Sequence, residues 1–317
     1  MKLSSGEHHL RSLSLTDLTR MSGFSSSTVS ESIRKEDLEN LTYRSLTKSE
    51  KDKVKISVRE ILRDNTIAKA GFESIERWRK GWQQILEQIR LNGVNENTLS
   101  PQYFTHNIMR FNGDYILPTE TNFENCVFHF LNLLTFKHYL TNISNVIEFG
   151  CGTGANLLQI HKLFPEIQLT GCDWAEPSQQ IINQINLEMG TNITPLNFNL
   201  FTLDGHEKLD ITDKTAVVTI HSMEQLGFDF EPFLEMLLTK EVAICLHLEP
   251  IIEFYNANLE FDALAIKYHR KRNYLKGFLN KLLELEKSGK IEVLKAHRCG
   301  FGSLYHEAYS IIIWRTL

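Results

Sequence analysis

The stretch that decides the fold runs from Asn145 to Asp173 and reads NVIEFGCGTGANLLQIHKLFPEIQLTGCD. It begins with an apolar run at 146–149, which is typical of a strand buried on both faces of a parallel sheet. Three glycines at alternate positions follow, and apolar residues then recur at helical spacing until Pro165 ends the helix. A second apolar run, 167–172, ends at Asp173. The stretch therefore predicts a strand, a glycine turn, a helix and a second strand with an acid at its tip.

The glycine turn and the terminal acid together predict a ligand that contains adenosine. Gly150, Gly152 and Gly154 can adopt a positive φ, and they lack the Cβ atom that would hold a ligand away from the backbone. An acid at the tip of the second strand, here Asp173, can accept hydrogen bonds from both hydroxyls of a ribose. The sequence thus predicts where the ligand lies before it predicts which ligand it is.

Two kinds of ligand have to be distinguished, because Gly150, Gly152 and Ala155 also match the G-x-G-x-x-G/A fingerprint of dinucleotide-binding domains. Glu148 argues against a dinucleotide, since a carboxylate two residues before the first glycine repels a pyrophosphate but attracts an ammonium or a sulfonium. The chain that follows also holds the predicted elements of one sheet only. A nicotinamide or flavin dinucleotide, and a related fold that binds no ligand, stay as alternatives.

The motif Glu148-Phe149-Gly150-Cys151-Gly152-Thr153-Gly154 resembles the first motif, E-x-G-x-G-x-G, of the class I S-adenosylmethionine-dependent methyltransferases. The resemblance covers about residues 100–317. It implies S-adenosyl-L-methionine as the cofactor. It also implies an α/β, Rossmann-like fold with a seven-stranded mixed sheet, in which an antiparallel hairpin closes five parallel strands.

The rest of the chain fits this architecture, because apolar runs and helical patterns alternate after Asp173. Two further runs near the end flank a loop with two glycines and predict an antiparallel hairpin. The predicted elements are parallel strands at 193–199, 216–220 and 242–248, a long helix at about 259–287, and hairpin strands at 291–297 and 309–314.

The chain divides into three predicted parts. Residues 1–45 are expected to be a flexible or loosely packed leader, 46–120 a helical appendage that acts as a lid, and 121–317 the methyltransferase domain. Within the leader, Leu15–Arg34 has the spacing of a helix-turn-helix, but its second half has almost no basic residue before Arg34. Two short helices without a DNA-binding role are therefore preferred.

The composition is that of a globular enzyme. Of 317 residues, 42% are hydrophobic and 23% charged, and the net charge of −5 gives no general attraction to nucleic acid or anionic lipid. No apolar run approaches the ~20 residues that span a bilayer, and the first residues lack a signal-peptide core. Five cysteines without a C-x-x-C pair favour a reducing compartment, so we expect a cytoplasmic protein. The scattered histidines predict no metal site.

Residues that follow the carboxyl ends of the strands are the candidates for the cofactor site, because ligands of open α/β sheets bind at that edge. Trp174 would lie against the adenine, and Asn156 would add a hydrogen bond to the methionine part. Asn199 stands where the family often has an acid that accepts from the adenine amino group. The predicted cofactor-binding residues are Glu148, Gly150, Cys151, Gly152, Gly154, Asn156, Asp173, Trp174, Asn199 and His221.

A catalytic base is needed only for an acceptor that must lose a proton, since methyl transfer from a sulfonium depends mainly on positioning. His221 follows the fourth strand and is the preferred base, because an imidazole with a pKa near 6.5 is partly neutral at working pH. A hydrogen-bonded structural histidine is the alternative. Glu224 and Glu249 are the next candidates, as partners of the base or acceptors for substrate hydroxyls, with surface carboxylates as the alternative.

Four segments also resemble a bacterial family described as sugar O-methyltransferases. They read NGDYILPTETNFEN at 112–125, HSMEQLG at 221–227, HLEPIIEFY at 247–255 and FGSLYHE at 301–307. This resemblance implies a small-molecule acceptor, namely a hydroxyl of a sugar or a sugar nucleotide. An N-methyltransferase for a small amine and a nucleic-acid-binding regulator are the alternatives.

Three residues are candidates for contact with that acceptor. Arg270 and Lys271 share a predicted helical face with Lys267 and Tyr274, and such a face can bind the phosphate of a phosphorylated or nucleotide-linked acceptor. A solvated surface is the alternative interpretation of these charges. Tyr115 lies shortly before the catalytic domain and is the third candidate.

Overall fold

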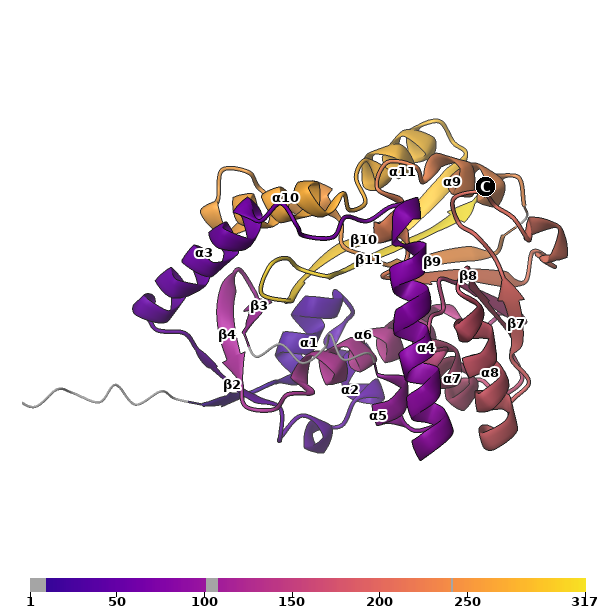
Figure 1. Ribbon diagram of the computed structural model, residues 1–317, viewed down its shortest axis with the longest axis horizontal. Helices are drawn as coiled ribbons and strands as arrows, with labels where there is room; N and C mark the ends of the chain where they lie inside the picture. The colour runs from indigo at the N-terminus through magenta and orange to yellow at the C-terminus, as the bar shows by residue number, and fades with distance from the viewer. Residues whose placement is uncertain (1–9, 101–107, 241) are drawn as a thin grey trace, which may run out of the picture.

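The computed structural model describes residues 10–100, 108–240 and 242–317, and its centre is one mixed sheet. The strands are β1 (Arg11–Ser12), β2 (Thr42–Ser45), β3 (Met109–Phe111), β4 (Asp114–Pro118), β5 (Asn145–Phe149), β6 (Gln168–Asp173), β7 (Thr194–Asn197), β8 (Thr215–Ile220), β9 (Ile244–Leu248), β10 (Ile291–Gly302) and β11 (Tyr309–Thr316). Their order is β1-β2-β4-β3-β10-β11-β9-β8-β5-β6-β7 (Figure 1). The strands from β9 to β7 pair in parallel, and every other pairing is antiparallel among the described residues.

The parallel strands are buried on both faces because helices cover each side. Along β5, Val146 belongs to one core cluster, whereas Ile147 and Phe149 belong to another on the opposite face. The first cluster includes side chains of α6 (Phe123–Tyr139), α7 (Ala155–Leu163) and α8 (Glu176–Met189). The second includes side chains of α9 (Glu231–Leu238) and α11 (Phe278–Lys287). The predicted α/β architecture is therefore confirmed, with the candidate ligand edge at the ends of β5, β6 and β8.

The sheet has eleven strands in the described part of the chain, so the prediction of seven was wrong in extent. β10 is longer than its partner β11, and its last residues Phe301 and Gly302 pair with Phe111 and Arg110 of β3. β3 and β4 form a hairpin whose turn residues Asn112 and Gly113 have φ values of 51° and 79°. An Asn-Gly turn between apolar residues is a strong hairpin signal, and the sequence interpretation of this segment as a linker missed it.

The leader is packed rather than loose over its described residues. It forms α1 (Leu15–Ser22), α2 (Ser26–Ser32) and the 3₁₀ turn η1 (Lys35–Asp37). Ser14 caps α1, and Asp17 completes a capping box. Leu18 and Val29 are fully buried in the same core cluster as the helices beside the sheet. The prediction of a flexible or loosely packed leader was therefore wrong for residues 10–45, because most of its apolar side chains are buried.

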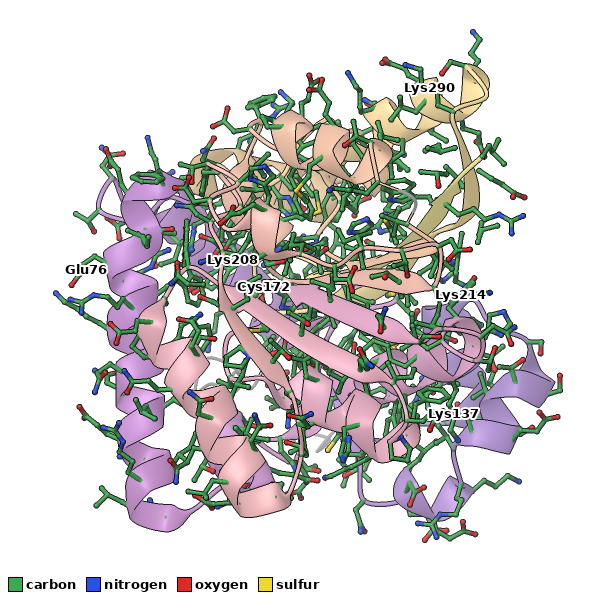
Figure 2. The ribbon with its side chains drawn as sticks, turned by 90° about the vertical axis from the view of Figure 1, so that its right-hand side faces the viewer. Glu76, Lys137, Cys172, Lys208, Lys214 and Lys290 are labelled. Atoms are coloured by element: carbon green, nitrogen blue, oxygen red, sulfur yellow. The ribbon has the colours of Figure 1, made fainter. Side chains whose placement is uncertain are left out.

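The predicted appendage contains two long helices, as its apolar spacing indicated. Thr47 caps α3 (Lys48–Arg63) through a capping box with Glu50. α4 (Ile75–Asn92) follows a short 3₁₀ turn, η2 (Phe72–Ser74), and ends at Gly93. Figures 1 and 2 show α4 beside α8 at the far edge of the sheet. A short helix, α5 (Glu96–Leu99), comes next.

The long helix predicted at 259–287 is two helices, α10 (Glu260–Arg272) and α11. Asn273 adopts φ 55° and Gly277 φ 89°, and these left-handed residues break the helix. Tyr274 therefore does not continue the helical face of Arg270. No helix in the described part of the chain combines the length and the apolar character needed to cross a membrane. The remaining turns are η4 (His206–Lys208), η5 (Met223–Leu226) and η6 (Ile252–Phe254).

Candidate active site

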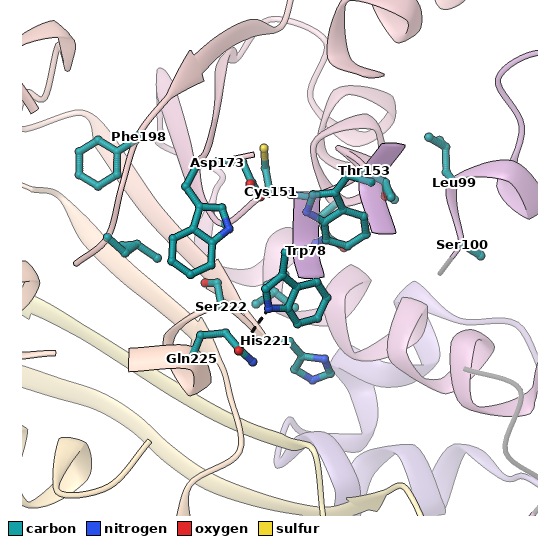
Figure 3. A pocket seen from close by; sticks show the side chains of 18 of the residues that line it. Trp78, Leu99, Ser100, Cys151, Thr153, Asp173, Phe198, His221, Ser222 and Gln225 are labelled. Atoms are coloured by element: carbon teal, nitrogen blue, oxygen red, sulfur yellow. Dashed lines mark hydrogen bonds between the residues drawn. The ribbon is translucent and has the colours of Figure 1, made fainter. Parts of the chain in front are cut away.

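A pocket lies over the glycine turn, at the carboxyl ends of the parallel strands (Figure 3). Its floor is the turn after β5, with Gly150, Cys151 and Gly152, and one side is formed by residues that follow β6 and β8. Trp78 and Trp82 of α4 line it as well, so that the N-terminal part of the chain covers the ligand edge of the sheet. This is the position at which open α/β sheets bind their ligands.

The glycines of the turn are required by the backbone and by close neighbours. Gly150 and Gly152 have φ values of 73° and 53°, in the left-handed region that side chains disfavour. A Cβ atom at Gly150 would collide with Ser222, which follows β8. A Cβ atom at Gly152 would lie 2.8 Å from Trp82 Cζ2. Glycine is thus needed in this turn for a second reason. Besides leaving room for a ligand, it avoids a collision with Ser222 or Trp82.

Asp173 ends β6 beneath the pocket, and its carboxylate also organises the turn. Oδ2 accepts a hydrogen bond from the Gly152 N–H at 3.0 Å, and Oδ1 accepts one from the Ala175 N–H at 2.8 Å. Burial raises the pKa of Asp173 to about 6, while these two backbone bonds act in the opposite direction. Each carboxylate oxygen has a second lone pair, so hydroxyl groups of a ligand can still bind there.

Glu148 lies below the turn and does not line the pocket. It is fully buried, and its Oε1 accepts a hydrogen bond of 2.7 Å from Asn156 Nδ2, whose own Oδ1 accepts from Asn132 Nδ2 at 3.0 Å. Glu148 Oε2 and Asn132 Oδ1 are buried without a hydrogen-bond partner. Burial raises the pKa of Glu148 to about 8. This chain of side chains therefore ends in two buried oxygens without a hydrogen-bond partner.

The residues after β6 and β7 form an aromatic wall. Trp174 stacks on Phe201, with ring centroids 5.6 Å apart and an interplanar angle of 11°. Both rings line the pocket, as does Phe198. Asn199 does not line it, because its Oδ1 accepts hydrogen bonds from the N–H groups of Phe201 and Thr202 and so holds the turn. The structure thus brings Trp174 to the pocket as expected, but not Asn199.

His221 follows β8 and lines the opposite end of the pocket (Figure 3). It adopts φ 52°, which is uncommon for a residue with a Cβ atom and is typical of functional positions. Its ring lies between Phe128, at 5.7 Å and 21°, and Tyr309, at 4.8 Å and 42°. Nε2 is buried without a hydrogen-bond partner. The ring is therefore held by its neighbours while one nitrogen stays unpaired.

The protonation of His221 differs from the sequence expectation of a pKa near 6.5. Burial lowers the pKa of His221 to about 4, and a hydrogen bond with the backbone of Ala308 raises it only in part. Because that bond stabilises the protonated ring, the ring donates to the Ala308 carbonyl. Nε2 has no partner, so the donor is Nδ1. His221 is accordingly neutral at pH 7, with a free lone pair on Nε2.

Glu249 and Glu224 lie behind the pocket wall, and neither lines it. The Glu249 carboxylate accepts hydrogen bonds from three successive backbone N–H groups, those of Ser222, Met223 and Glu224, at 3.0 to 3.2 Å. It therefore fixes the turn after His221 rather than facing a substrate. Glu224 Oε1 accepts from Gln225 Nε2 at 2.9 Å, and burial raises the pKa of Glu224 to about 8. Both were predicted as catalytic groups, and the structure gives them supporting positions.

The architecture can be compared with known proteins at this point. No family model matches the chain, and no curated protein matches it by sequence. The solved structure of the [4+2]-cyclase SpnF is similar, with 13% identity, coverage of 79% of this chain and 97% of that chain, and a TM-score of 0.52. This similarity concerns the fold alone, since one fold hosts many activities.

Two further solved structures are similar at lower scores. The 16S rRNA methylase ArmA has 14% identity, with 74% of this chain and 98% of that chain covered, and a TM-score of 0.45. The mitomycin 7-O-methyltransferase MmcR has 13% identity, with 98% and 89% covered, and a TM-score of 0.40.

The packing of α4 against the pocket is the feature that the sequence indicated least clearly. Trp78 and Trp82, one turn apart on α4, stack with centroids 5.5 Å apart and an angle of 28°. Gln225, in the turn after β8, holds this helix, because its Oε1 accepts from Trp78 Nε1 at 3.2 Å and from Ser74 Oγ at 3.4 Å. The tryptophan spacing was visible in the sequence as core or lid packing, but nothing there connected it with Gln225.

The predicted acceptor contacts are not brought to this pocket. Tyr115 is buried in β4 and lines a separate pocket with Asp114 and Phe261. Arg270 is exposed on α10, and neither it nor Lys271 lines the pocket of His221. Among the residues that the structure describes, no group of three or more His, Cys, Asp or Glu side chains could hold a metal ion.

Proposed function

We propose that the protein is an S-adenosylmethionine-dependent methyltransferase that moves a methyl group to a hydroxyl of a small molecule. One observation carries this proposal. A single pocket joins the glycine turn, Asp173 and the Trp174–Phe201 stack to the imidazole of His221, whose buried Nε2 has no hydrogen-bond partner. The first set provides the backbone, acid and aromatic surface that an adenosine requires, and the second provides a base for an acceptor.

The residues present fit S-adenosylmethionine. The backbone of Gly150 and Gly152 would contact its methionine part, Asp173 would accept from the ribose hydroxyls, and Trp174 with Phe201 would cover the adenine. The bound cofactor supplies an electrophilic methyl group on a sulfonium. Cys151 also lines the pocket, but burial raises the pKa of its thiol, so that it would act as a neutral wall residue.

The unpaired oxygens below the turn support a cationic ligand. Glu148 Oε2 and Asn132 Oδ1 are buried and lack donors, and Asn156, which joins them, lines the pocket. An ammonium group carries donors and a positive charge, and its approach would lower the raised pKa of Glu148. A pyrophosphate would instead raise this pKa further, because a negative charge nearby disfavours ionisation of Glu148, and this disfavours a dinucleotide.

His221 is the proposed general base. Its Nδ1–H is fixed on the Ala308 carbonyl, so its neutral Nε2 can take the proton of an acceptor hydroxyl. The rings of Phe128 and Tyr309 hold the imidazole orientation. Glu249 would act through the backbone, because it fixes the turn that begins directly after His221.

A hydroxyl is favoured over an amine as the acceptor group. A small amine is mostly an ammonium ion at pH 7, and a carboxylate would be expected beside it. Among the described lining residues the one carboxylate is Asp173, which lies at the opposite end from His221. The described lining also has no Lys or Arg, which weighs against a phosphorylated or nucleotide-linked acceptor. A sugar hydroxyl stays the acceptor predicted from the sequence.

The lid role predicted for 46–120 is part of the proposal, since Trp78 and Trp82 cover the pocket. A cytoplasmic location also stays a prediction, supported by five cysteines that are all free.

Calorimetric titration with S-adenosylhomocysteine tests the cofactor assignment. We expect one site per chain and no binding of NAD⁺ under the same conditions. Gly81→Ala is the matched control for substitutions in the glycine turn such as Gly152→Val, because Gly81 is helical and a Cβ atom there has no neighbour within 4 Å. Binding of NAD⁺ without binding of S-adenosylhomocysteine would refute the proposal.

A further inference from the structure

The end of the pocket around His221 is built mainly from rings. Phe128 lies nearly parallel to the imidazole, at 5.7 Å and 21°. Trp78, which stacks on Trp82, lies beside His221 in the pocket (Figure 3). Ile220, which directly precedes His221, also lines the pocket. Flat aromatic surfaces of this kind favour a flat partner, because stacked rings add attraction beyond the apolar area that they bury.

The polar groups nearest His221 already bind other parts of the protein (Figure 3). Ser222 Oγ donates to the Phe149 carbonyl at 2.8 Å, and Gln225 Oε1 accepts from Trp78 Nε1 at 3.2 Å. No Lys or Arg lines the pocket within the described ranges. A sugar would bring several hydroxyls into this space, and each hydroxyl without a partner would weaken binding. An anionic acceptor would find no cation. Both the shape and the charge of the walls therefore favour an uncharged, mostly apolar molecule.

The weak basicity of His221 also favours an acceptor with an acidic hydroxyl group. Burial lowers the pKa of His221 to about 4, which makes Nε2 a weak proton acceptor. Transfer to a weak base requires an acidic donor, and a phenol with a pKa of about 10 is far more acidic than an aliphatic hydroxyl. A stronger base would be expected opposite a sugar.

We infer that the acceptor is an uncharged, planar phenol whose ring packs against Phe128 and Trp78 and whose hydroxyl meets Nε2 of His221. This inference rests on the proposed function and narrows its substrate class, replacing the sugar expected from the sequence. In the reaction, the phenolic oxygen forms a bond to the methyl carbon while the carbon–sulfur bond of the cofactor breaks. The sulfur keeps the electron pair and becomes a neutral thioether, and the phenolic proton moves to His221 Nε2.

Binding to the protein saturated with S-adenosylhomocysteine tests the inference. The probes are 2-naphthol, its saturated counterpart trans-2-decalol, which has the same carbon skeleton without a flat ring, and methyl glucoside. We expect 2-naphthol to bind at least about tenfold more tightly than either other probe. Phe128→Leu should remove most of this preference while keeping an apolar wall. Phe228→Leu is the matched control, because Phe228 is 58% exposed and lies outside the pocket lining.

The outcomes distinguish a failure of the cofactor assignment from a failure of the acceptor assignment. If S-adenosylhomocysteine does not bind, the proposed function fails and this inference fails with it. If it binds but 2-naphthol shows no advantage over trans-2-decalol, or methyl glucoside binds more tightly, the phenol assignment is wrong and the cofactor assignment stands. An unchanged preference in Phe128→Leu would likewise overturn the placement of the acceptor ring.

Discussion

The indole ring of Trp82 packs on the backbone of Gly152, so closely that a Cβ atom at Gly152 would lie 2.8 Å from Trp82 Cζ2. Trp82 belongs to α4 of the N-terminal part, whereas Gly152 belongs to the turn after the first parallel strand. The pocket is therefore not complete within residues 121–317. Its roof and its floor come from segments that the sequence assigned to separate parts of the chain.

Gly152→Val should abolish binding of S-adenosylhomocysteine. Valine is strained at φ 53°, and its side chain would displace Trp82 from the turn. We expect an affinity loss of at least about 10²-fold in calorimetric titration, the effect of a cradle that no longer forms. Circular dichroism should show that the variant is folded. Retained affinity would mean that the ligand does not contact this turn.

His221→Asn should lower turnover about 10²-fold or more while leaving affinity for S-adenosylhomocysteine nearly unchanged, as expected for a base that acts only on the acceptor. The protonated imidazole is the inactive form. With a pKa of about 4, the rate should rise as pH increases through about 4 and stay level to neutral pH. The measurement is a pH–rate profile with a fixed acceptor. A rise centred near pH 6.5 would show that His221 is less buried during turnover.

Glu249→Ala should destabilise the protein by roughly 3 kcal/mol, because three buried backbone N–H groups would lose their acceptor. Glu249→Gln keeps one acceptor oxygen and should recover part of this loss. Thermal unfolding of both variants measures the difference. If Glu249 instead took the acceptor proton, the Gln variant would unfold like the native protein but lose its turnover.

Local signals explain which parts of the fold could be predicted. The parallel strands, the glycine turn and the capped helix at Thr47 all follow from short stretches whose pattern is decided by neighbours in sequence. The four additional strands could not be counted in this way, because β3 joins the sheet only through Phe301 and Gly302, on the edge of β10 opposite β11. The break at Asn273 depends on one residue in the left-handed conformation, which its sequence allows but does not require.

The sequence predicted which residues lie at the site better than it predicted what each of them does. Asp173, Trp174 and His221 lie in one pocket because strand ends converge at one edge of a parallel sheet. The role of Glu249 could not be predicted, since an acid after a strand can face either a ligand or the neighbouring turn. Arg270 is outside the pocket for a related reason: helical spacing predicts a shared face but not which way that face points.

Several buried carboxyl groups and histidines make the stability depend on pH in opposite directions. Burial raises the pKa of Glu124 from 4.5 to about 8, so the folded protein holds a proton that the unfolded chain releases, and stability falls as pH rises through this range. Burial lowers the pKa of His247 from 6.5 to about 3, so stability falls as pH decreases below about 6.5. The same directions hold for the carboxyl groups of Glu148 and Glu224 and for the imidazoles of His221 and His269.

The cofactor-free protein should therefore be most stable between about pH 5 and 6.5, where the two sets of groups oppose each other, and should lose stability from about pH 6.5 to 8. Glu124→Gln should reduce this alkaline loss by up to about 1.4 kcal/mol per pH unit, because it removes one group that must release its proton. Glutamine can still accept the hydrogen bond of 3.3 Å that Tyr309 donates to Glu124. The measurement is the free energy of unfolding by denaturant at several pH values, with the exposed Glu166→Gln as the control. A stability that rises steadily to pH 8 in the native protein would mean that these carboxyl groups are ionised in the fold, and the protonated state assigned to Glu124 would be wrong.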